Sequence, residues 1–196
     1  HWSALTMKEV AAQILSAAPE RFALVGTSMG GYAALEIIRQ APERVSSLIL
    51  MSTSAKADTP ERSKGRREQV AAAKKPNSMR ETIKGLWPKI VHPARHEDHP
   101  LLNVFFDMAE HLGVSAFERQ IEAIISREDS RPLLATIKVP TLVVVGKDDA
   151  LIPPDEGREI AAGIAGARLE EVEHAGHMCM TEKPDTVTNL LAEFLS

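Results

Sequence analysis

A serine, Ser28, lies in the glycine-rich turn Gly26–Gly31, whose residues have the spacing G-x-S-x-G. The turn follows a short apolar run, Phe22–Val25, and precedes a helical pattern that extends to about Gln40. At a sharp strand-to-helix turn of this kind, a serine hydroxyl is held clear of the backbone beside helix N–H groups that stabilise developing negative charge. We therefore predict that Ser28 is a nucleophile; the alternative is an ordinary turn serine.

Two later segments carry groups that can activate such a hydroxyl. Asp148 and Asp149 follow one apolar run, and His174 and His177 follow another. A serine hydroxyl is a weak nucleophile at neutral pH, so it needs a base within hydrogen-bond reach and a carboxylate that orients this base. We predict that His177 is the base and Asp149 the carboxylate, with Asp148 as the alternative. His174 is expected to shape its loop.

The elements that must position these residues alternate between strands and helices. Strands that read as nearly continuous apolar runs, separated by helices, are typical of a parallel sheet that is covered on both faces. The predicted strands are Phe22–Val25, Val45–Met51, Thr141–Gly146 and Ala167–Val172. The predicted fold class is therefore α/β, with about four parallel strands and the candidate residues beyond their carboxyl ends.

The region between the second and third predicted strands lacks a strand signal. Its apolar residues recur at helical spacing. Ser78 and Ser115, like Thr6 near the N-terminus, each precede a glutamate by three residues, which predicts a helix start. We predict that residues 55–135 form a helical cap over the carboxyl edge of the sheet, and that residues 1–54 and 136–196 form the core.

These segments together resemble the α/β-hydrolase family over nearly the whole chain. That family has G-x-x-D before a proline-rich turn, which Gly146–Pro154 matches with Asp149 as the acid, and its final G-H falls on Gly176-His177. The resemblance is closest to small capped bacterial members, which include enol-lactonases and carboxylesterases. It implies a serine hydrolase that cleaves a small ester or lactone through an acyl-enzyme without a cofactor, with the Met29 N–H as one oxyanion donor.

The start of the chain departs from that family's pattern. The family has several strands before the elbow strand, and a loop among them supplies a second oxyanion donor. Here about 20 residues precede Phe22, and they read as helical. We therefore expect an N-terminally shortened sheet whose first strand, Phe22–Val25, has an open edge that invites pairing with a second copy. The alternative function is a truncated, catalytically poor homologue that acts as an oligomeric or ligand-binding protein.

The composition limits the kinds of partner and the cellular compartment that we expect for this chain. A net charge of −4 gives no reason to expect nucleic acid, and no apolar run approaches the roughly 18 residues of a membrane span. Cys179 is the single cysteine, so no intrachain disulfide forms and a cytoplasmic location is expected. Prolines interrupt the cluster His92, His96 and His99, so we do not expect a metal site there.

Overall fold

The computed structural model describes residues 4–75 and 78–196 of the chain. Within these residues, four parallel strands form one sheet in the order β1-β2-β3-β4. The strands are β1 (Phe22–Thr27), β2 (Val45–Met51), β3 (Thr141–Gly146) and β4 (Arg168–Val172). The α/β fold class and the four strands predicted from the sequence are confirmed, with β1 two residues longer and β4 one residue shorter than expected.

Helices cover the sheet and fill the connections between its strands. The α-helices are α1 (Met7–Ala17), α2 (Met29–Gln40), α3 (Pro60–Ala73), α4 (Ser78–Ile90), α5 (His99–Leu112), α6 (Val114–Ile125), α7 (Arg131–Leu134), α8 (Pro154–Gly163), α9 (Cys179–Glu182) and α10 (Pro184–Leu195). Two 3₁₀-helices, Pro42–Arg44 and Pro93–Arg95, complete the described helical elements.

Side chains of the central strands alternate between two apolar layers. Leu48 and Leu50 of β2 pack with residues of α2 and α8 on one face of the sheet. Ile49 and Met51 pack with residues of α10 on the opposite face. Because β2 and β3 are covered on both faces, their sequences are continuously apolar rather than alternating.

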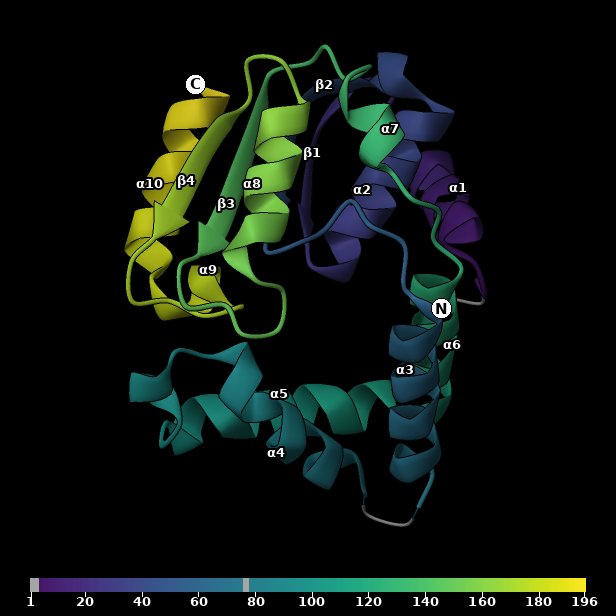
Figure 1. Ribbon diagram of the computed structural model, residues 1–196, viewed down its shortest axis with the longest axis vertical. Coiled ribbons are helices and arrows are strands. Elements are labelled where there is room, and N and C mark those ends of the chain that lie inside the picture. The colour runs from purple at the N-terminus through teal and green to yellow at the C-terminus, as the bar shows by residue number, and fades with distance from the viewer. Residues whose placement is uncertain (1–3, 76–77) are drawn as a thin grey trace.

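The segment between β2 and β3 crosses the carboxyl ends of the strands. Within the described residues, its regular elements are all helical. Figure 1 shows α4 and α5 lying below the carboxyl ends of β3 and β4, with α3 and α6 running alongside each other at one side. We refer to α3–α6 as the insertion. Domain boundaries at residues 55 and 135 stay a prediction.

Of the three predicted helix starts, the one at Ser115 needs correction, and Ser78 begins a helix without acting as its N-cap. The capping box at Thr6 is present, because its hydroxyl accepts the Glu9 N–H and the Glu9 carboxylate accepts the Thr6 N–H. Ser78, however, is the first residue of α4, and its hydroxyl donates to the Ala73 carbonyl at 2.7 Å. Ser115 lies inside α6, since Gly113 is the N-cap and its φ of 75° suits glycine. Main-chain geometry rather than a serine cap begins α6.

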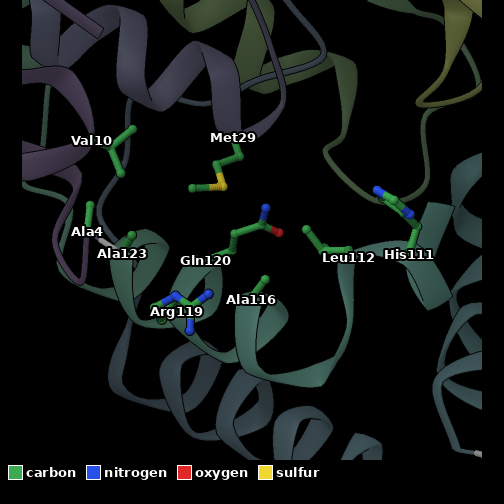
Figure 2. Close-up of a pocket in the computed structure, with 9 residues that line it drawn as sticks. All are labelled: Ala4, Val10, Met29, His111, Leu112, Ala116, Arg119, Gln120 and Ala123. Carbon is green, nitrogen blue, oxygen red and sulfur yellow. The ribbon is translucent and has the colours of Figure 1, made fainter. Parts of the chain in front are cut away.

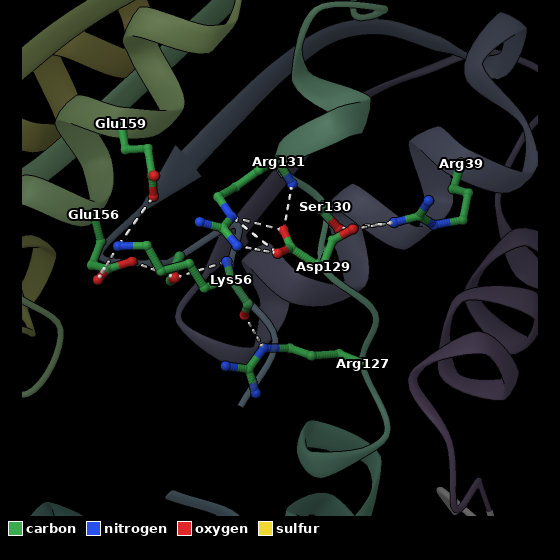
Figure 3. Close-up of polar contacts among 9 residues, drawn as sticks. Arg39, Lys56, Arg127, Asp129, Ser130, Arg131, Glu156 and Glu159 are labelled. Atoms are coloured by element: carbon green, nitrogen blue, oxygen red, sulfur yellow. Dashed lines mark hydrogen bonds and ion pairs between the residues drawn. The ribbon is translucent and has the colours of Figure 1, made fainter. Parts of the chain in front are cut away.

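Polar contacts anchor the two chain segments that join the insertion to the core (Figure 3). Lys56 Nζ lies 2.9 Å from Glu156 Oε1 and 3.2 Å from Glu159 Oε2, both on α8. Arg127 Nε donates to the Lys56 carbonyl at 2.9 Å, and its Nη2 donates to Asp58 Oδ1 at 2.7 Å. These bonds tie the outgoing segment to the returning one, so the insertion is fixed at both ends.

Replacing Asp58 with Asn is expected to destabilise this junction. The Asp58 and Arg127 side chains are buried, and Arg66 Nε also donates to Asp58 at 2.6 Å. Burial raises the pKa of Asp58, but the bonds from Arg66 and Arg127 outweigh it and hold that pKa below its ordinary value. Breaking a buried ion pair by removing one charge costs about 3 kcal/mol of unfolding free energy.

Urea unfolding at several pH values tests this effect. Because folding lowers the pKa of Asp58, its stabilisation is present above the ordinary carboxyl pKa and is lost as pH falls through the native value. The free energy of unfolding of wild type should therefore exceed that of Asp58→Asn by the full amount at pH 7, and this difference should shrink below about pH 4. Asp155→Asn, at an exposed carboxylate paired with Arg158, is the control. A difference that stays constant with pH would contradict the assignment.

β1 lies at one edge of the sheet and pairs only with β2 among the described strands. Val25 on this strand is 45 % exposed. A hollow of about 250 Å³ runs along the same edge and is lined mainly by apolar side chains, among them Val10, Ile14, Leu24 and Val25. Across residues 4–75 and 78–196, no helix has the length and apolar character needed to cross a membrane.

Candidate functional site

Ser28 occupies a strained turn between β1 and α2. Its φ of 51° and ψ of −114° lie in a region that residues with a side chain rarely adopt. Hydrogen bonds hold it there: its N–H donates to the Met51 carbonyl at 2.9 Å, and its own carbonyl accepts the Gly31 N–H at 2.9 Å and the Thr53 hydroxyl at 2.8 Å. The surrounding structure therefore fixes the one backbone position that the sequence marks as a nucleophile.

Glycine is required on both sides of this serine by close packing. A Cβ on Gly26 would lie 2.3 Å from the Gly30 carbonyl oxygen, and one on Gly31 would lie 2.4 Å from Thr53 Oγ1. A side chain on Gly26 would separate strand β1 from helix α2, and one on Gly31 would separate α2 from the segment after β2. Close packing thus explains Gly26, the first glycine of the G-x-S-x-G motif, whereas a Cβ on Gly30, the second, would meet no atom within 4 Å.

Asp149 and His177 form a buried pair beyond the ends of β3 and β4. Asp149 Oδ2 lies 2.8 Å from His177 Nδ1, and the two residues are 4 % and 3 % exposed. Asp149 Oδ1 accepts the N–H groups of Leu151 at 2.9 Å and Ile152 at 2.8 Å. An ionised carboxylate only accepts, so the ring proton of His177 belongs on Nδ1 and leaves Nε2 as a proton acceptor.

The loops that carry this pair touch each other directly. A Cβ on Gly146 would lie 1.9 Å from the Gly176 carbonyl oxygen, so the end of β3 and the histidine loop meet without space for a side chain. Since all four strands are parallel, Ser28, Asp149 and His177 follow carboxyl ends at the same edge of the sheet. This edge is where α/β sheets bind ligands.

Asp148, the alternative acid, points elsewhere. Its side chain is 43 % exposed, and its Oδ2 lies 3.6 Å from His92 Nε2 in the insertion. His174, with a φ of 53°, lies edge-to-face with His92 at 5.8 Å between ring centroids. Of the two aspartates that the sequence left open, the structure pairs Asp149 with His177.

Three potential metal-ligand atoms lie within 4.8 Å of one another, on His92, Asp148 and His174. This group shares only His92 with the cluster His92, His96 and His99 that the sequence suggested. His92 Nδ1 accepts the Ala94 N–H at 3.1 Å, which places the ring proton on Nε2. Ligation of a metal by Nε2, the atom that faces Asp148, would require this proton to move to Nδ1 and would break the bond from Ala94. In this arrangement the group serves as a polar contact between insertion and core.

A cavity of about 330 Å³ opens beside the elbow, between α1 and α2 on one side and α5 and α6 on the other. Figure 2 shows the Met29 side chain pointing into it toward Gln120. The lining residues are Ala4, Val10, Met29, His111, Leu112, Ala116, Arg119, Gln120 and Ala123. Sequence reasoning did not single out His111, Arg119 or Gln120, because a polar residue on a helix face reads the same whether it faces solvent or a cavity.

Cys179 is a buried free thiol two residues after His177. Burial is the main cause that raises the pKa of Cys179 to about 11. Its thiolate fraction at pH 7 is then roughly 10⁻⁴, and the thiolate is the reactive form.

We expect native protein to resist an aromatic disulfide reagent such as DTNB while urea-unfolded protein reacts with one equivalent. Fast labelling of the native chain, absent in Cys179→Ala, would show that the thiol is accessible and reactive.

Known proteins resemble this chain in sequence and in fold. The sequence matches the alpha/beta hydrolase family over residues 1–190. It is 31 % identical over 181 residues to the 2-hydroxy-6-oxononadienedioate/2-hydroxy-6-oxononatrienedioate hydrolase of Klebsiella pneumoniae, a match that covers 88 % of this chain. The same match covers 62 % of that relative, so the chain spans less than two thirds of its length.

Two solved structures share the architecture. The enol-lactonase of Burkholderia xenovorans LB400 is 28 % identical, with a TM-score of 0.86 over 97 % of this chain and 73 % of that one. A thermophilic esterase of Thermogutta terrifontis is 29 % identical, with a TM-score of 0.81 over 98 % of this chain and 73 % of that one. The family match, the shared fold and the strained serine turn lead to one conclusion: this chain belongs to the alpha/beta hydrolase family.

Proposed function

We propose that this chain is a serine hydrolase that cleaves a small carboxylic ester or lactone through an acyl-enzyme. The observation that carries the proposal is the buried 2.8 Å contact between Asp149 and His177, at the same edge of the sheet as Ser28 in its strained turn. Nucleophile, base and orienting carboxylate are the three groups that acyl transfer to serine needs. The single cysteine supports a cytoplasmic location for this activity.

In this mechanism, Ser28 Oγ attacks the substrate carbonyl and its proton passes to His177 Nε2. The Met29 N–H, at the start of α2, donates to the oxyanion of the tetrahedral intermediate, because the first N–H groups of a helix have no partner within it. His177 then gives its proton to the leaving oxygen. A water molecule, deprotonated by His177, attacks the acyl-enzyme, and the protonated His177 returns that proton to Ser28 Oγ as the bond to serine breaks and the acid leaves.

The cavity that Met29 lines, next to Ser28 in the sequence, is the place we assign to the substrate, although Ser28, Asp149 and His177 are not among its lining residues. Its volume of about 330 Å³ lies at the lower end of the range for ligand pockets. Met29 and Leu112 provide apolar walls, and Gln120 provides an amide that can fix the orientation of a polar group. The relatives' names, a hydrolase of hydroxy-oxo-diacids and an enol-lactonase, are consistent with small oxygenated substrates.

Hydrolysis of p-nitrophenyl butyrate and of a small lactone tests the proposal. We expect turnover of both that saturates with substrate concentration and that is lost after pre-treatment with a fluorophosphonate. Folded protein that hydrolyses neither compound above the rate in buffer would contradict the proposal.

A second candidate rests on the open edge of β1. Exposed Val25 and the apolar hollow beside it offer a surface on which a second copy can pair strand to strand. The chain would then be a catalytically poor homologue that persists as an oligomer. Size-exclusion chromatography with light scattering, run beside the ester assay, separates the two candidates: a monomer with high turnover excludes the second, and an inactive dimer favours it.

A further inference from the structure

Glu182, the last residue of α9, has a buried carboxylate that joins two segments far apart in the sequence. Its Oε1 accepts the N–H of Gly176 at 2.7 Å, and its Oε2 accepts the N–H of His92 at 2.7 Å. Gly176 directly precedes His177, whereas His92 follows α4 in the insertion. Glu182 is 5 % exposed. One carboxylate therefore binds the histidine loop to the insertion.

A second bond fixes the other side of His177. The N–H of Met178 donates to the Ile90 carbonyl at 3.1 Å. The histidine loop and the insertion also touch, because a Cβ on Gly176 would lie 2.7 Å from the backbone nitrogen of His92. The residues on both sides of His177 are thus fixed: Glu182 binds Gly176, and Ile90 of the insertion binds Met178.

The chemistry of this position favours a carboxylate over any neutral side chain of similar size. Two backbone N–H groups approach from two segments, that of Gly176 buried and that of His92 partly buried, and N–H groups removed from water need an acceptor. A carboxylate offers two acceptor oxygens, and bonds from N–H groups to it are short and strong. Gln offers one acceptor and one donor, so it leaves one N–H facing another N–H.

We propose that Glu182 is a positioning residue. It holds His177 where its Nε2 can accept the proton of Ser28, and it makes this placement depend on the position of the insertion. The inference rests on the proposed function, because it takes His177 to be the base. Glu182 touches no reacting atom; it acts through the backbone of the histidine loop. A displacement of about 1 Å in a catalytic group can lower the rate about 10²-fold.

Glu182→Gln, compared with Glu36→Gln, tests this assignment. Glu36 is also buried, and its carboxylate also accepts two hydrogen bonds, from Arg39 and Gln40 toward the far end of α2. The measurements are kcat and KM on p-nitrophenyl butyrate, the rate and final stoichiometry of fluorophosphonate labelling, and hydrogen–deuterium exchange of the peptides that contain residues 90–95 and 174–178.

For Glu182→Gln we expect kcat to fall about 10- to 100-fold with KM changed less than about threefold. Labelling should slow in parallel but still reach one adduct per chain, and exchange should speed up in both peptides. Glu36→Gln should leave kcat and the exchange of these peptides as in wild type. The separation of labelling rate from final stoichiometry distinguishes displacement of the base from loss of folded protein.

Three outcomes would overturn the inference. The first is a Glu182→Gln variant with wild-type kcat. The second is a loss of stoichiometry that accounts for the whole loss of kcat, which indicates a structural role only. The third is unchanged exchange in both peptides. Failure of the proposed function looks different: wild type itself would take up no fluorophosphonate at Ser28, even where exchange shows that Glu182 anchors both segments.

Discussion

Replacing Ser28 with Ala is expected to lower kcat for ester hydrolysis by about 10⁶-fold, to the level left by oxyanion binding and substrate positioning. Alanine keeps the Cβ, so the backbone at φ 51° bears the same strain and the bonds from Gly31 and Thr53 to its carbonyl remain. The melting temperature should therefore stay close to that of wild type.

Ser16→Ala provides the matched control for this substitution. Ser16 is exposed on α1, and its hydroxyl donates to the Gln13 carbonyl one turn earlier. Its kcat should equal that of wild type. A Ser28→Ala variant that keeps more than about a tenth of wild-type kcat would show that another group performs the attack.

Replacing Asp149 with Asn is expected to lower kcat by about 10⁴-fold. The N–H groups of Leu151 and Ile152 require an oxygen at the Oδ1 position, so the new amide must turn its NH₂ group toward His177 Nδ1. Nδ1 can then only accept, and the ring proton moves to Nε2. The histidine loses the lone pair that would take the proton of Ser28.

Asp148→Asn is the matched control, because it makes the same change one residue earlier at an exposed side chain that faces His92. We expect its kcat to lie within about threefold of wild type, since exposed charge pairs contribute little. Steady-state kinetics of both variants give the comparison. A larger loss in Asp148→Asn than in Asp149→Asn would reverse the assignment of the two carboxylates.

The central strands could be predicted from the sequence because burial on two faces leaves a strong compositional signal. β2 and β3 have the bounds expected from their apolar runs. The elbow was equally legible, since a serine between glycines after a strand has few other uses. The order serine, aspartate, histidine along the chain then indicated Ser28, Asp149 and His177 as one catalytic group.

Contacts between distant segments could not be predicted in this way. Glu182 bonds to Gly176 and His92, and the latter lies 90 positions earlier, so no local periodicity marks it. The choice between Asp148 and Asp149 also depended on how the turn after β3 orients each side chain. The start of α6 was misplaced because Gly113, with a φ of 75°, begins the helix before Ser115.

Labelling with a fluorophosphonate, followed by peptide mass spectrometry, is the most direct test of Ser28 as the nucleophile. We expect one covalent adduct per chain on the peptide that contains Ser28, no adduct in Ser28→Ala, and much slower labelling in Asp149→Asn. An adduct on a different residue, or equal labelling of wild type and Ser28→Ala, would contradict this role of Ser28.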